Sequence, residues 1–383
     1  MMKHLPVVYS SGTHRMAALE MTLHRVTPLL GAMGITRVAD ITGLDRLGIP
    51  TWCAVRPGGL VIQVSNGKGL SHLSAKVSAI MEGIEHWHAE NPEVSFRKSS
   101  AAELRGEGEV FVPATELPRW LTKLHLTDRR VVDWVRGEQL PSGDPIWLPA
   151  CACFLVEPML LNYDHNGLAS GNHIVEATLH GLYEVIERHS MARLTRGGLS
   201  LPRGESRVIN LGSLTSAPLM ELRDCLRKAE VGLTLVRVES VGPVHTFLAV
   251  LVDPASPFAC SAVNMGHGSH LSPDVAALRA ITEAAQSRLT FIHGSREDLR
   301  PESYIFDEAH QRLRAFFATR RGDLNWHAIA DHSSGDLQQD LETTIEGLNA
   351  AGYSRIYRLN MTNSRFAIPI VKVFVPGLAV MAY

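Results

Sequence analysis

The sequence lacks the features that would place the protein in a membrane, outside the cell or on nucleic acid. No window holds about 18 uninterrupted apolar residues, the length that a membrane-spanning helix needs. The start of the chain has no apolar stretch like that of a signal peptide. Lys and Arg total 37 against 39 Asp and Glu, so there is no basic excess for nucleic acid. We expect a cytoplasmic protein without membrane or nucleic-acid partners, in which a local cluster of charge must hold any bound anion.

The chain contains few cysteines, and their number is odd. Five cysteines in a long chain without a secretory signal indicate reduced thiols rather than a disulfide framework. Cys151 and Cys153 form a C-x-C pair within the apolar run 146–156, where period two would put both thiols on one face of a strand. A metal site would need two more ligands nearby, and none is evident. We therefore interpret the pair as structural.

Several common signatures of catalysis and of chain organisation are also missing. Gly67-Lys68-Gly69 does not fit the Walker A pattern, so a P-loop fold is not expected. Neither G-x-S-x-G nor H-E-x-x-H occurs, which leaves the common hydrolase interpretations without support. No repeat, low-complexity tract or long linker is evident. With 383 residues and a hydrophobic content of 45%, the sequence predicts one domain over residues 1–383.

Periodicity predicts several long helices and a larger number of short strands. Helices are expected over residues 17–33, 74–89, 174–194, 272–291 and 341–351. Strands are expected over residues 60–64, 146–156, 234–238, 246–252, 355–359 and 368–375. Small-residue turns or loops are expected at 65–69, 166–172 and 264–268. The strands do not follow a clean βαβ alternation, so we predict an α+β fold with mixed or antiparallel sheets and packed helices.

Three of these helices carry polar residues on a face of their own. On helix 74–89, Ser78, Glu82 and Glu85 share one face at i, i+4 and i+7. The corresponding faces of helices 174–194 and 272–291 hold Glu176, His180, Glu184 and Glu187 beside Arg188, and Arg279, Glu283 and Gln286 near Arg288. Carboxylates three residues apart on one face repel each other unless something positive lies between them.

Two interpretations of these faces are open. Any one of them could be an ordinary solvated helix face. All three together favour a shared site, because each helix is otherwise apolar or small and two follow glycine-rich loops that can present backbone N–H groups to an anion. Convergent carboxylates suit a hard cation such as Mg²⁺. Two such ions bridging the phosphates of a nucleotide would remove the repulsion and assist phosphoryl transfer.

The same residues resemble the three motifs of the YcaO family. Ser78-x-x-x-Glu82-x-x-Glu85 is similar to the first motif. The second and third motifs resemble Asn172-x-x-x-Glu176 followed by Glu184-x-x-Glu187-Arg188, and Glu283-Ala-Ala-Gln286-Ser-Arg288. Segment 15–25 looks like the family's amino-terminal segment, which reaches the phosphates, and the ending 369–378 is also family-like.

The resemblance implies a fold of the family's own kind that binds ATP and Mg²⁺ and is not a P-loop fold. The metal-binding work would be shared by Glu82, Glu85, Glu184 and Glu187. The nucleotide-binding residues would be Arg15, Thr22, Arg25, Ser78, Asn172, Glu176, Arg188, Glu283, Gln286 and Arg288. No catalytic base is assigned.

The family's reaction, as the resemblance implies it, adds a nucleophile to a peptide carbonyl, and ATP then phosphorylates the resulting oxygen to make it a leaving group. A neighbouring Cys, Ser or Thr side chain would give an azoline, external sulfide a thioamide, and an amine an amidine. Azoline-forming members often end in Pro-x-Pro-x-Pro, whereas this chain ends Gly377-Leu-Ala-Val-Met-Ala-Tyr383. Segment 286–298 looks like that of stand-alone members that make backbone thioamides with a TfuA partner. Thioamidation is therefore the preferred expectation.

The expected partners follow from the same resemblance. They are a peptide or protein substrate, a TfuA-like protein and a second copy of the chain in a homodimer. The alternatives are an azoline-forming cyclodehydratase, a non-catalytic peptide-binding accessory subunit, an ATP-binding regulatory protein and a helper in ribosomal-protein modification. All the motif glutamates are present, which favours the enzyme over the accessory subunit.

Four polar residues outside the motifs are weighed separately. Lys68 could contact a phosphate or be a solvated turn lysine. His86 and His88 are two residues apart, do not share a helix face and so are not expected to bind a metal together. His165 could carry a proton near neutral pH, but a position in a surface loop is the simpler interpretation.

We predict that Glu82→Gln and Glu187→Gln each abolish Mg²⁺-dependent ATP hydrolysis and leave the fold intact. Each substitution removes a charged metal ligand and keeps the size of the side chain. Phosphate release and circular dichroism, measured on the same preparations, check both halves of this expectation. Turnover at the wild-type rate in either variant would remove that residue from the metal site.

Overall fold

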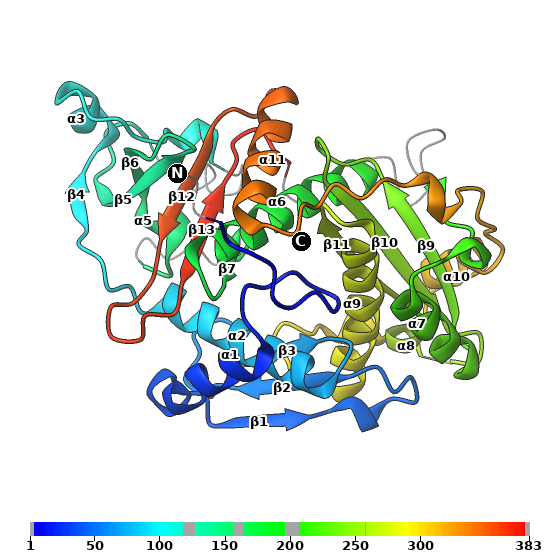
Figure 1. Ribbon diagram of the computed structural model, residues 1–383. Coiled ribbons are helices and arrows are strands. Elements are labelled where there is room, and N and C mark those ends of the chain that lie inside the picture. The colour runs from blue at the N-terminus through cyan, green and yellow to red at the C-terminus, as the bar shows by residue number, and fades with distance from the viewer. Residues whose placement is uncertain (1–3, 118–126, 157–163, 196–206, 257, 380–383) are drawn as a thin grey trace.

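The structure, a computed structural model, describes residues 4–117, 127–156, 164–195, 207–256 and 258–379 (Figure 1). The tail residues 380–383 therefore lie outside the described residues. The longer helices are α1 (Leu19–Val26), α2 (His72–Glu90), α6 (Ile174–Thr195), α7 (Ala217–Lys228), α9 (Pro273–His293), α10 (Glu308–Ala318) and α11 (Leu337–Ala350). The shorter helices are α3 (Ala101–Gly106), α5 (Ala150–Cys153) and α8 (Ala259–Ala262). No described helix has the length and apolar character needed to cross a membrane.

The strands form three sheets. The first contains β1 (Arg37–Asp40), β2 (Thr51–Val55) and β3 (Val64–Lys68). The second has the order β4-β5-β12-β13-β7 with β6 beside β5, and its strands are β4 (Arg97–Ser99), β5 (Val132–Leu140), β6 (Asp144–Pro149), β7 (Leu168–Ser170), β12 (Ile356–Asn360) and β13 (Ile370–Phe374). The third has the order β11-β10-β9-β8, with β8 (Arg207–Val208), β9 (Gly232–Val238), β10 (His245–Val252) and β11 (Val263–His270). Every ladder between these described strands is antiparallel, which confirms the predicted fold class.

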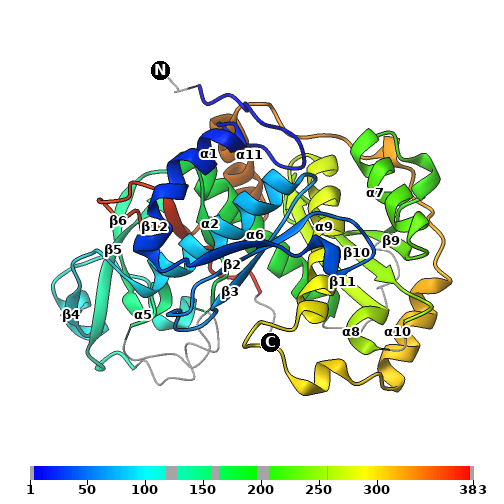
Figure 2. The same ribbon diagram turned by 90° about the horizontal axis from the view of Figure 1, so that it is seen from below.

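Three long helices occupy the middle of the molecule, and each is backed by its own sheet. Figure 1 shows α2 above β1–β3, α6 beside β7 and β13, and α9 beside β10 and β11, and Figure 2 shows the same arrangement from below. Each helix also touches the strand that leads into another of the three: α2 touches β7, α6 touches β11, and α9 touches β3. The contacts therefore close a ring, which turns one face of each helix toward a common centre.

The apolar stripe of each helix fits this arrangement. Ile80 and Ile84 of α2, Leu182 and Ile186 of α6, and Ile281 of α9 are completely buried. Burial of such a side chain contributes about 1.5–3 kcal/mol, so these stripes hold the helices on their sheets. The polar faces are consequently left to face the centre of the ring.

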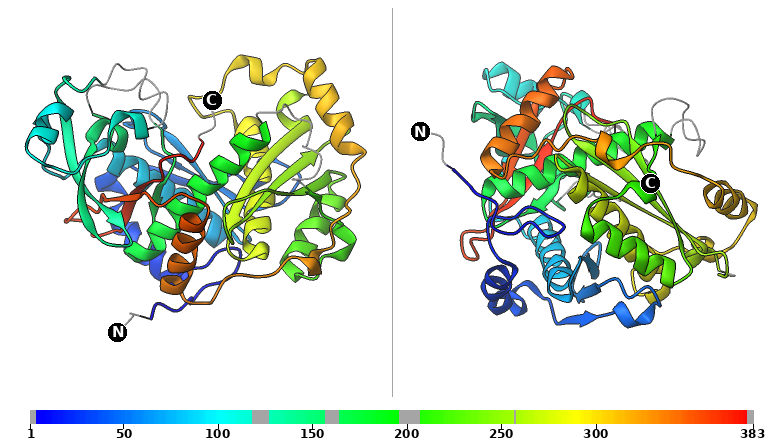
Figure 3. Two further views of the ribbon diagram at one scale, coloured as in Figure 1. Left: turned by 90° about the horizontal axis from the view of Figure 1, so that it is seen from above. Right: turned by 45° about the vertical axis from the view of Figure 1, so that its right-hand side comes forward.

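The amino-terminal segment runs past this centre and is fastened at a distant part of the chain. The two views of Figure 3 show it beside α11. The N–H of Leu337 donates to the carbonyl of Leu5, and the N–H of Val7 donates to the carbonyl of Gly335. This fixes the approach of residues 14–16 to α6.

Helices α2, α6 and α9 each follow a strand at nearly the same spacing, and small residues line each strand–helix contact. A Cβ on Gly67 of β3 would lie 2.0 Å from the backbone nitrogen of Ala79, and one on Gly268 of β11 would lie 2.1 Å from the carbonyl oxygen of Ala276. In the third unit, Ala177 and Gly181 of α6 stand at the corresponding helix positions. The three units thus share a backbone spacing, which the sequence does not reveal as a repeat because few residue identities recur.

All three predicted small-residue loops contain strand residues, and in segment 166–172 these are Leu168–Ser170 of β7. The other two segments lie almost entirely within strands. Residues 65–69 were expected to form a turn after a strand at 60–64, but β3 covers Val64–Lys68 and residues 60–63 form no strand. Residues 264–268 were expected to form a loop, but they lie inside β11. The reason is the same for β3 and β11. Gly67, Gly266 and Gly268 allow a helix to pack closely against the strand, and none of the three has a left-handed backbone.

Two other expected elements end earlier than the hydrophobic pattern suggests. Strand β6 ends at Pro149, which has no N–H for a ladder, and the buried Cys151 and Cys153 lie in the short helix α5. Helix α1 ends at Val26, since Pro28 cannot continue the α-helical hydrogen bonds, and short 3₁₀ turns lead to Gly34 in the left-handed region. The helices expected over 74–89, 174–194, 272–291 and 341–351 are all present.

We predict that Gly67→Ala and Gly268→Ala each lower the free energy of unfolding by about 1–3 kcal/mol, because the new methyl group meets helix backbone that cannot move aside cheaply. Gly106→Ala is the matched control, since its Cβ would meet open space. Urea denaturation measures the three differences. Equal stability of the Gly67 variant and the control would contradict the close approach.

Candidate active site

Carboxylates from three helices meet at the centre of the ring. Glu82 of α2, Glu184 of α6 and Glu283 of α9 stand at the same position counted from the first residue of their helices. Three residues further along follow Glu85, Glu187 and the amide Gln286. Glu85 interacts electrostatically with Glu82 and Glu184, and Glu187 interacts with Glu283. The structure therefore brings together the four predicted metal ligands and adds Glu283 to them.

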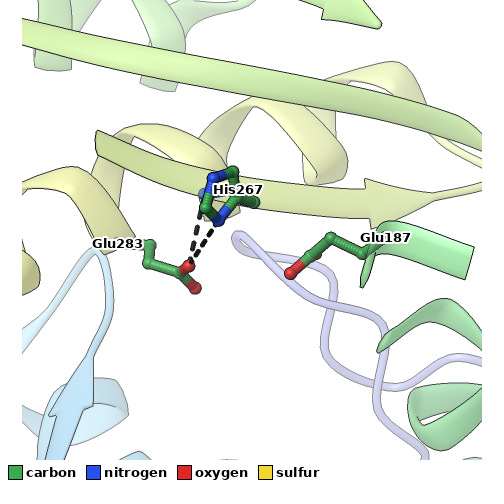
Figure 4. Close-up of side chains that lie close together, drawn as sticks. All are labelled: Glu187, His267 and Glu283. Carbon is green, nitrogen blue, oxygen red and sulfur yellow. Dashed lines mark hydrogen bonds and ion pairs between the residues drawn. The ribbon is translucent and has the colours of Figure 1, made fainter. Parts of the chain in front are cut away.

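A histidine joins two of these carboxylates. Ligand atoms of Glu187, His267 and Glu283 all lie within 4.8 Å of one another, and Figure 4 shows them facing one another from α6, β11 and α9. The backbone N–H of His267 donates to Glu283 Oε1 over 3.3 Å, and its Nδ1 lies 3.4 Å from the same oxygen. Sequence reasoning placed residue 267 in a loop and missed it. The alternation of β11 around Gly266 and Gly268 was the only available signal.

Burial makes these carboxylates hard to ionise without a cation. It raises the pKa of Glu82 to about 7 and that of Glu184 to about 7, although Arg296 and Arg188, respectively, act against the rise. Burial also raises the pKa of Glu85 to about 8; Glu82 and Glu184 add to this, and hydrogen bonds from Ser170 oppose it. A divalent cation would remove both the desolvation cost and the repulsion. The donor set of carboxylates fits Mg²⁺, which prefers oxygen ligands.

Basic residues surround the carboxylates. Lys68 Nζ lies 2.5 Å from Glu283 Oε2, so Lys68 is held in the site by an ion pair, and the alternative of a solvated turn lysine is wrong. Burial alone would raise the pKa of Glu283, but Lys68 and His267 hold it well below its usual value. Burial alone would lower the pKa of Arg188, but Glu184, Glu187 and Glu283 hold it above its usual value. Positive charge is therefore present wherever the carboxylates converge.

A second group of predicted residues gathers at the start of α6. Asn172 donates to Glu176 Oε1 from its backbone N–H over 3.1 Å and from its side chain over 3.2 Å. Thr22 Oγ1 donates to Asn172 Oδ1 over 2.9 Å, and Arg15 Nη1 lies 3.4 Å from Glu176 Oε1. Glu176 also accepts the backbone N–H of Met16 over 2.9 Å. The amino-terminal segment thus reaches α6, as the predicted nucleotide site requires.

Two more of the predicted nucleotide-binding residues, Arg25 and Ser78, lie outside the group at the start of α6. Arg25 is exposed, and its guanidinium donates to the carbonyl oxygen of Ala367. Ser78 lies one turn before Glu82 on the same face of α2. The structure thus places Ser78 beside the carboxylates, while the one hydrogen bond it records for the side chain of Arg25 leads elsewhere.

Of the third motif, Glu283 reaches the carboxylates, whereas Gln286 binds β3 and Arg288 lies on another side of α9. Gln286 Nε2 donates to the backbone oxygen of Asn66 in β3, which ties α9 to that strand. Arg288 is buried on the other side of α9, with Nε 2.8 Å from Asp45 and Nη1 3.1 Å from Asp253. Five residues after Glu283, a helical side chain points away from the first one. Arg288 is therefore a structural ion-pair residue in this structure.

Several residues of the site were not predicted from the sequence as binding residues. Ser170 donates its backbone N–H to Glu85 Oε1 over 2.8 Å and its hydroxyl to the same oxygen. Arg279, on the polar face of α9, lies 3.4 Å from His180 Nε2 and stands at the helix position that Ser78 has in α2. Arg296 follows α9 and interacts electrostatically with Glu82. Helical spacing already placed Arg279 and His180 on the polar faces, without assigning them to a ligand. Arg296 lies in segment 286–298, but no sequence feature places it at the carboxylates.

His165 is not an exposed surface residue. Its ring lies 4.5 Å from that of His86, whose Nδ1 is within 3.2 Å of Ser65 Oγ. Burial lowers the pKa of His165 well below its usual value, and His86 adds to this. His165 does lie in a loop, as interpreted, but it is half-buried rather than exposed, and its lowered pKa leaves the imidazole neutral near pH 7.

This geometry agrees with a comparison across protein families. The sequence model of the family described as YcaO cyclodehydratase, ATP- and Mg²⁺-binding, matches residues 66–379. The chain belongs to the YcaO family. The resemblance inferred from the motifs is thus confirmed, and ATP and Mg²⁺ are the cofactors of the family.

Solved structures share the fold of this YcaO protein. YcaO from Methanopyrus kandleri, solved with AMPPCP and Mg²⁺, matches with a TM-score of 0.79 and 26% identity, over 98% of this chain and 94% of that one. A heterocyclase solved with substrate and cofactor matches with a TM-score of 0.78 and 20% identity, over 99% of this chain and 54% of that one. The second likeness concerns the fold alone.

Sequence relatives cover nearly the whole chain. An uncharacterized protein of Mycobacterium tuberculosis is 34% identical over 97% of this chain and 84% of its own length. An uncharacterized protein in the tfuA 3′ region of Rhizobium leguminosarum bv. trifolii is 31% identical over 94% of this chain and 87% of its own length. The second relative is described by its position next to tfuA.

We predict that Mg²⁺ stabilises the protein more at pH 8.5 than at pH 6. The folded state keeps protons on Glu82, Glu85 and Glu184 up to pKa values of about 7, 8 and 7, whereas the usual value is 4.5. Without metal, the stability linked to these protons is complete below about pH 4.5 and is lost as the pH rises through about 7–8. Mg²⁺ takes the place of the protons, so its stabilisation grows over the same range.

The measurement is the rise in melting temperature on adding saturating Mg²⁺ at both pH values. Glu85→Gln should reduce the difference between them. Glu221→Gln, which changes an exposed carboxylate on α7, is the matched control and should behave as wild type. Equal shifts at the two pH values in the wild type would contradict the assignment of raised pKa values.

Proposed function

We propose that this YcaO protein activates a backbone amide of a ribosomally made peptide or protein by ATP-dependent phosphorylation, and that it installs a thioamide there with a TfuA-like partner. The observation that carries the proposal is the convergence of Glu82, Glu85, Glu184, Glu187 and Glu283 at one centre. These carboxylates could hold the Mg²⁺ that phosphoryl transfer from ATP requires. Residues 1–383 would act as one domain, because segment 5–18 joins α11 to α6.

The metal-binding residues in this proposal are Glu82, Glu85, Glu184 and Glu187, together with Glu283 and His267. Mg²⁺ bound by them would neutralise phosphate oxygens and stabilise charge during phosphoryl transfer. Glu85 is held toward the centre by its two hydrogen bonds from Ser170. Lys68 keeps Glu283 ionised, so that Glu283 is ready as a ligand without first losing a proton.

The nucleotide would lie along α6. Glu176 and Glu184 are about two turns apart on that helix, which corresponds to about 12 Å. Asn172 and Glu176 would bind the base or sugar end, with Ser78 nearby. Arg15 and Thr22, which contact these two residues, would reach from the amino-terminal segment toward the phosphates. Arg188 and Lys68 would hold the phosphate end, where their charges face the carboxylates. Gln286 would act by fixing β3, and Arg25 keeps its predicted role only if it releases the carbonyl of Ala367.

The proposed reaction balances as follows. Sulfide adds to the carbonyl carbon of the peptide, and the former carbonyl oxygen becomes an oxyanion. This oxygen takes the γ-phosphoryl group of ATP, and ADP is released. Phosphate then departs with that oxygen, a proton is lost and the carbon–sulfur double bond remains. Arg188, Lys68 and Arg279 would stabilise the charge that builds up on the transferred group.

Thioamidation is favoured over cyclisation by two observations. Segment 286–298 resembles that of members that act with TfuA, and a relative in Rhizobium leguminosarum is described as lying in the tfuA 3′ region. The alternative is an azoline-forming cyclodehydratase, which the description of the matching family as a cyclodehydratase favours. A homodimer and a non-catalytic accessory role stay predictions from the sequence.

The test is mass spectrometry of a candidate precursor peptide after incubation with the protein, ATP, Mg²⁺ and sulfide, with and without a TfuA-like protein. We expect a gain of about 16 Da, because an external nucleophile replaces oxygen by sulfur. A loss of about 18 Da would instead show that a side chain of the peptide is the nucleophile.

Two control variants separate the outcomes. Glu187→Gln should give unmodified peptide, and Glu221→Gln should behave as wild type. No mass change in any sample, despite ATP binding, would contradict the enzymatic proposal and favour the accessory subunit. A mass change that survives in Glu187→Gln would contradict the proposed metal site.

A further inference from the structure

A pair of arginines faces each other on the outer part of the third sheet, away from the carboxylates. Arg207 of β8 is the direct cross-strand partner of Arg237 of β9. Side chains of directly opposed residues lie on the same side of a sheet and within reach of each other. Two like charges in that position destabilise the strand pair unless a negative group lies between them.

The surrounding acids do not neutralise this pair. Asp323 lies 3.3 Å from Arg207, but both side chains are more than half exposed, at 51% and 67%, so the ion pair is weak. Glu239 also lines the hollow; it lies 2.8 Å from Arg193 of α6, and it is not among the charges that shift the pKa of Arg237. Within the described ranges, the side chain of Arg237 makes no ion pair or hydrogen bond. Burial lowers the pKa of Arg237, and Arg207 adds to this, so an anion would relieve both effects.

The two arginines line a hollow of about 310 Å³. Its walls also include Glu239, Ser240, His245 and Leu324. The volume is at the lower end of the range for small-ligand sites, which suits one phosphate- or carboxylate-bearing group and little more. His245 Nε2 is 2.8 Å from the carbonyl oxygen of Ala330, and its ring stacks on His332 at 5.1 Å, so this wall is held in place.

The hollow is separate from the central site. Val236 and Val238 of β9 pack toward α6 and α10, so Arg237 between them lies on the other face, with Leu235. Two strand spacings, about 10 Å, separate β9 from β11. His245 of β10, which also lines the hollow, is the cross-strand neighbour of His270 of β11. The ring of His270 lies 4.6 Å from that of His14. The hollow is therefore close to the amino-terminal segment and contains none of the carboxylates of the central site.

We propose that Arg207 and Arg237 form a binding site for a phosphate or carboxylate group of a small ligand. Arginine binds both groups through paired hydrogen bonds from its planar guanidinium, and two arginines side by side can bind the two edges of one group. This proposal does not depend on the reaction proposed above.

The test measures binding of inorganic phosphate, and separately of succinate, by calorimetry to the full chain with the nucleotide site filled by a non-hydrolysable ATP analogue and Mg²⁺. Arg237→Gln should weaken the binding at least tenfold. Arg227→Gln, on the exposed end of α7, is the matched control and should bind as wild type. Affinity for the ATP analogue should be the same in all three proteins.

Melting temperatures provide a second measurement, and its expected pattern would not arise if Arg237 had only a structural role. Without added anion, Arg237→Gln should melt at a higher temperature than wild type, because the like-charge repulsion is gone. Phosphate or succinate should raise the melting temperature of wild type and of Arg227→Gln but not that of Arg237→Gln. Binding of phosphate alone would identify a phosphorylated ligand, and binding of succinate alone a carboxylate.

Three outcomes would overturn the proposal. One is that neither anion binds the wild type. Another is that Arg237→Gln binds both anions as tightly as the wild type. The third is that Arg237→Gln also loses the ATP analogue, because the anion would then report on the central site.

Discussion

Repulsion among buried carboxylates is the constraint on which the rest of this structure depends. Five glutamates from three helices meet in a partly buried centre, and desolvation raises the pKa of Glu82, Glu85 and Glu184 to about 7–8. Such a centre is stable only if the helices are held rigidly and if positive charge compensates it. Lys68 and Arg188 supply part of that charge within the chain, and the remainder corresponds to the Mg²⁺ that the family binds.

The rigidity has an identifiable source. Each of the three helices lies on a strand through residues with almost no side chain, such as Gly67 against Ala79 and Gly268 against Ala276. Each helix is also tied to the strand of another unit, for example by Gln286 to Asn66 and by Glu85 to Ser170. The ring therefore fixes the distance between carboxylates that would otherwise separate. The three units are not equivalent in charge, because α9 carries Arg279 and Gln286 where α2 carries Ser78 and Glu85, and this asymmetry gives the centre a basic side.

Much of this could be predicted from the sequence, and the errors have physical causes. The 3.6-residue pattern identified α2, α6, α9 and α11, because a long amphipathic stripe is a strong signal. The glycine-rich segments around Gly67 and Gly268 were interpreted as loops, because sequence alone does not distinguish a glycine that turns the chain from one that admits a neighbouring helix. Arg288 was assigned to the nucleotide by motif resemblance, yet it pairs with Asp45 and Asp253, residues far from it in the sequence.

The sequence by itself determined the family, the three acidic helix faces and the identity of the main carboxylates, since these depend on spacing within one helix. Only the tertiary structure decided which faces meet, and therefore that Glu283 joins Glu187 and His267, that Lys68 is an ion-pair partner, and that Arg207 faces Arg237. Contacts between distant segments depend on how sheets and helices pack. That packing is a property of the whole chain, and no local pattern encodes it.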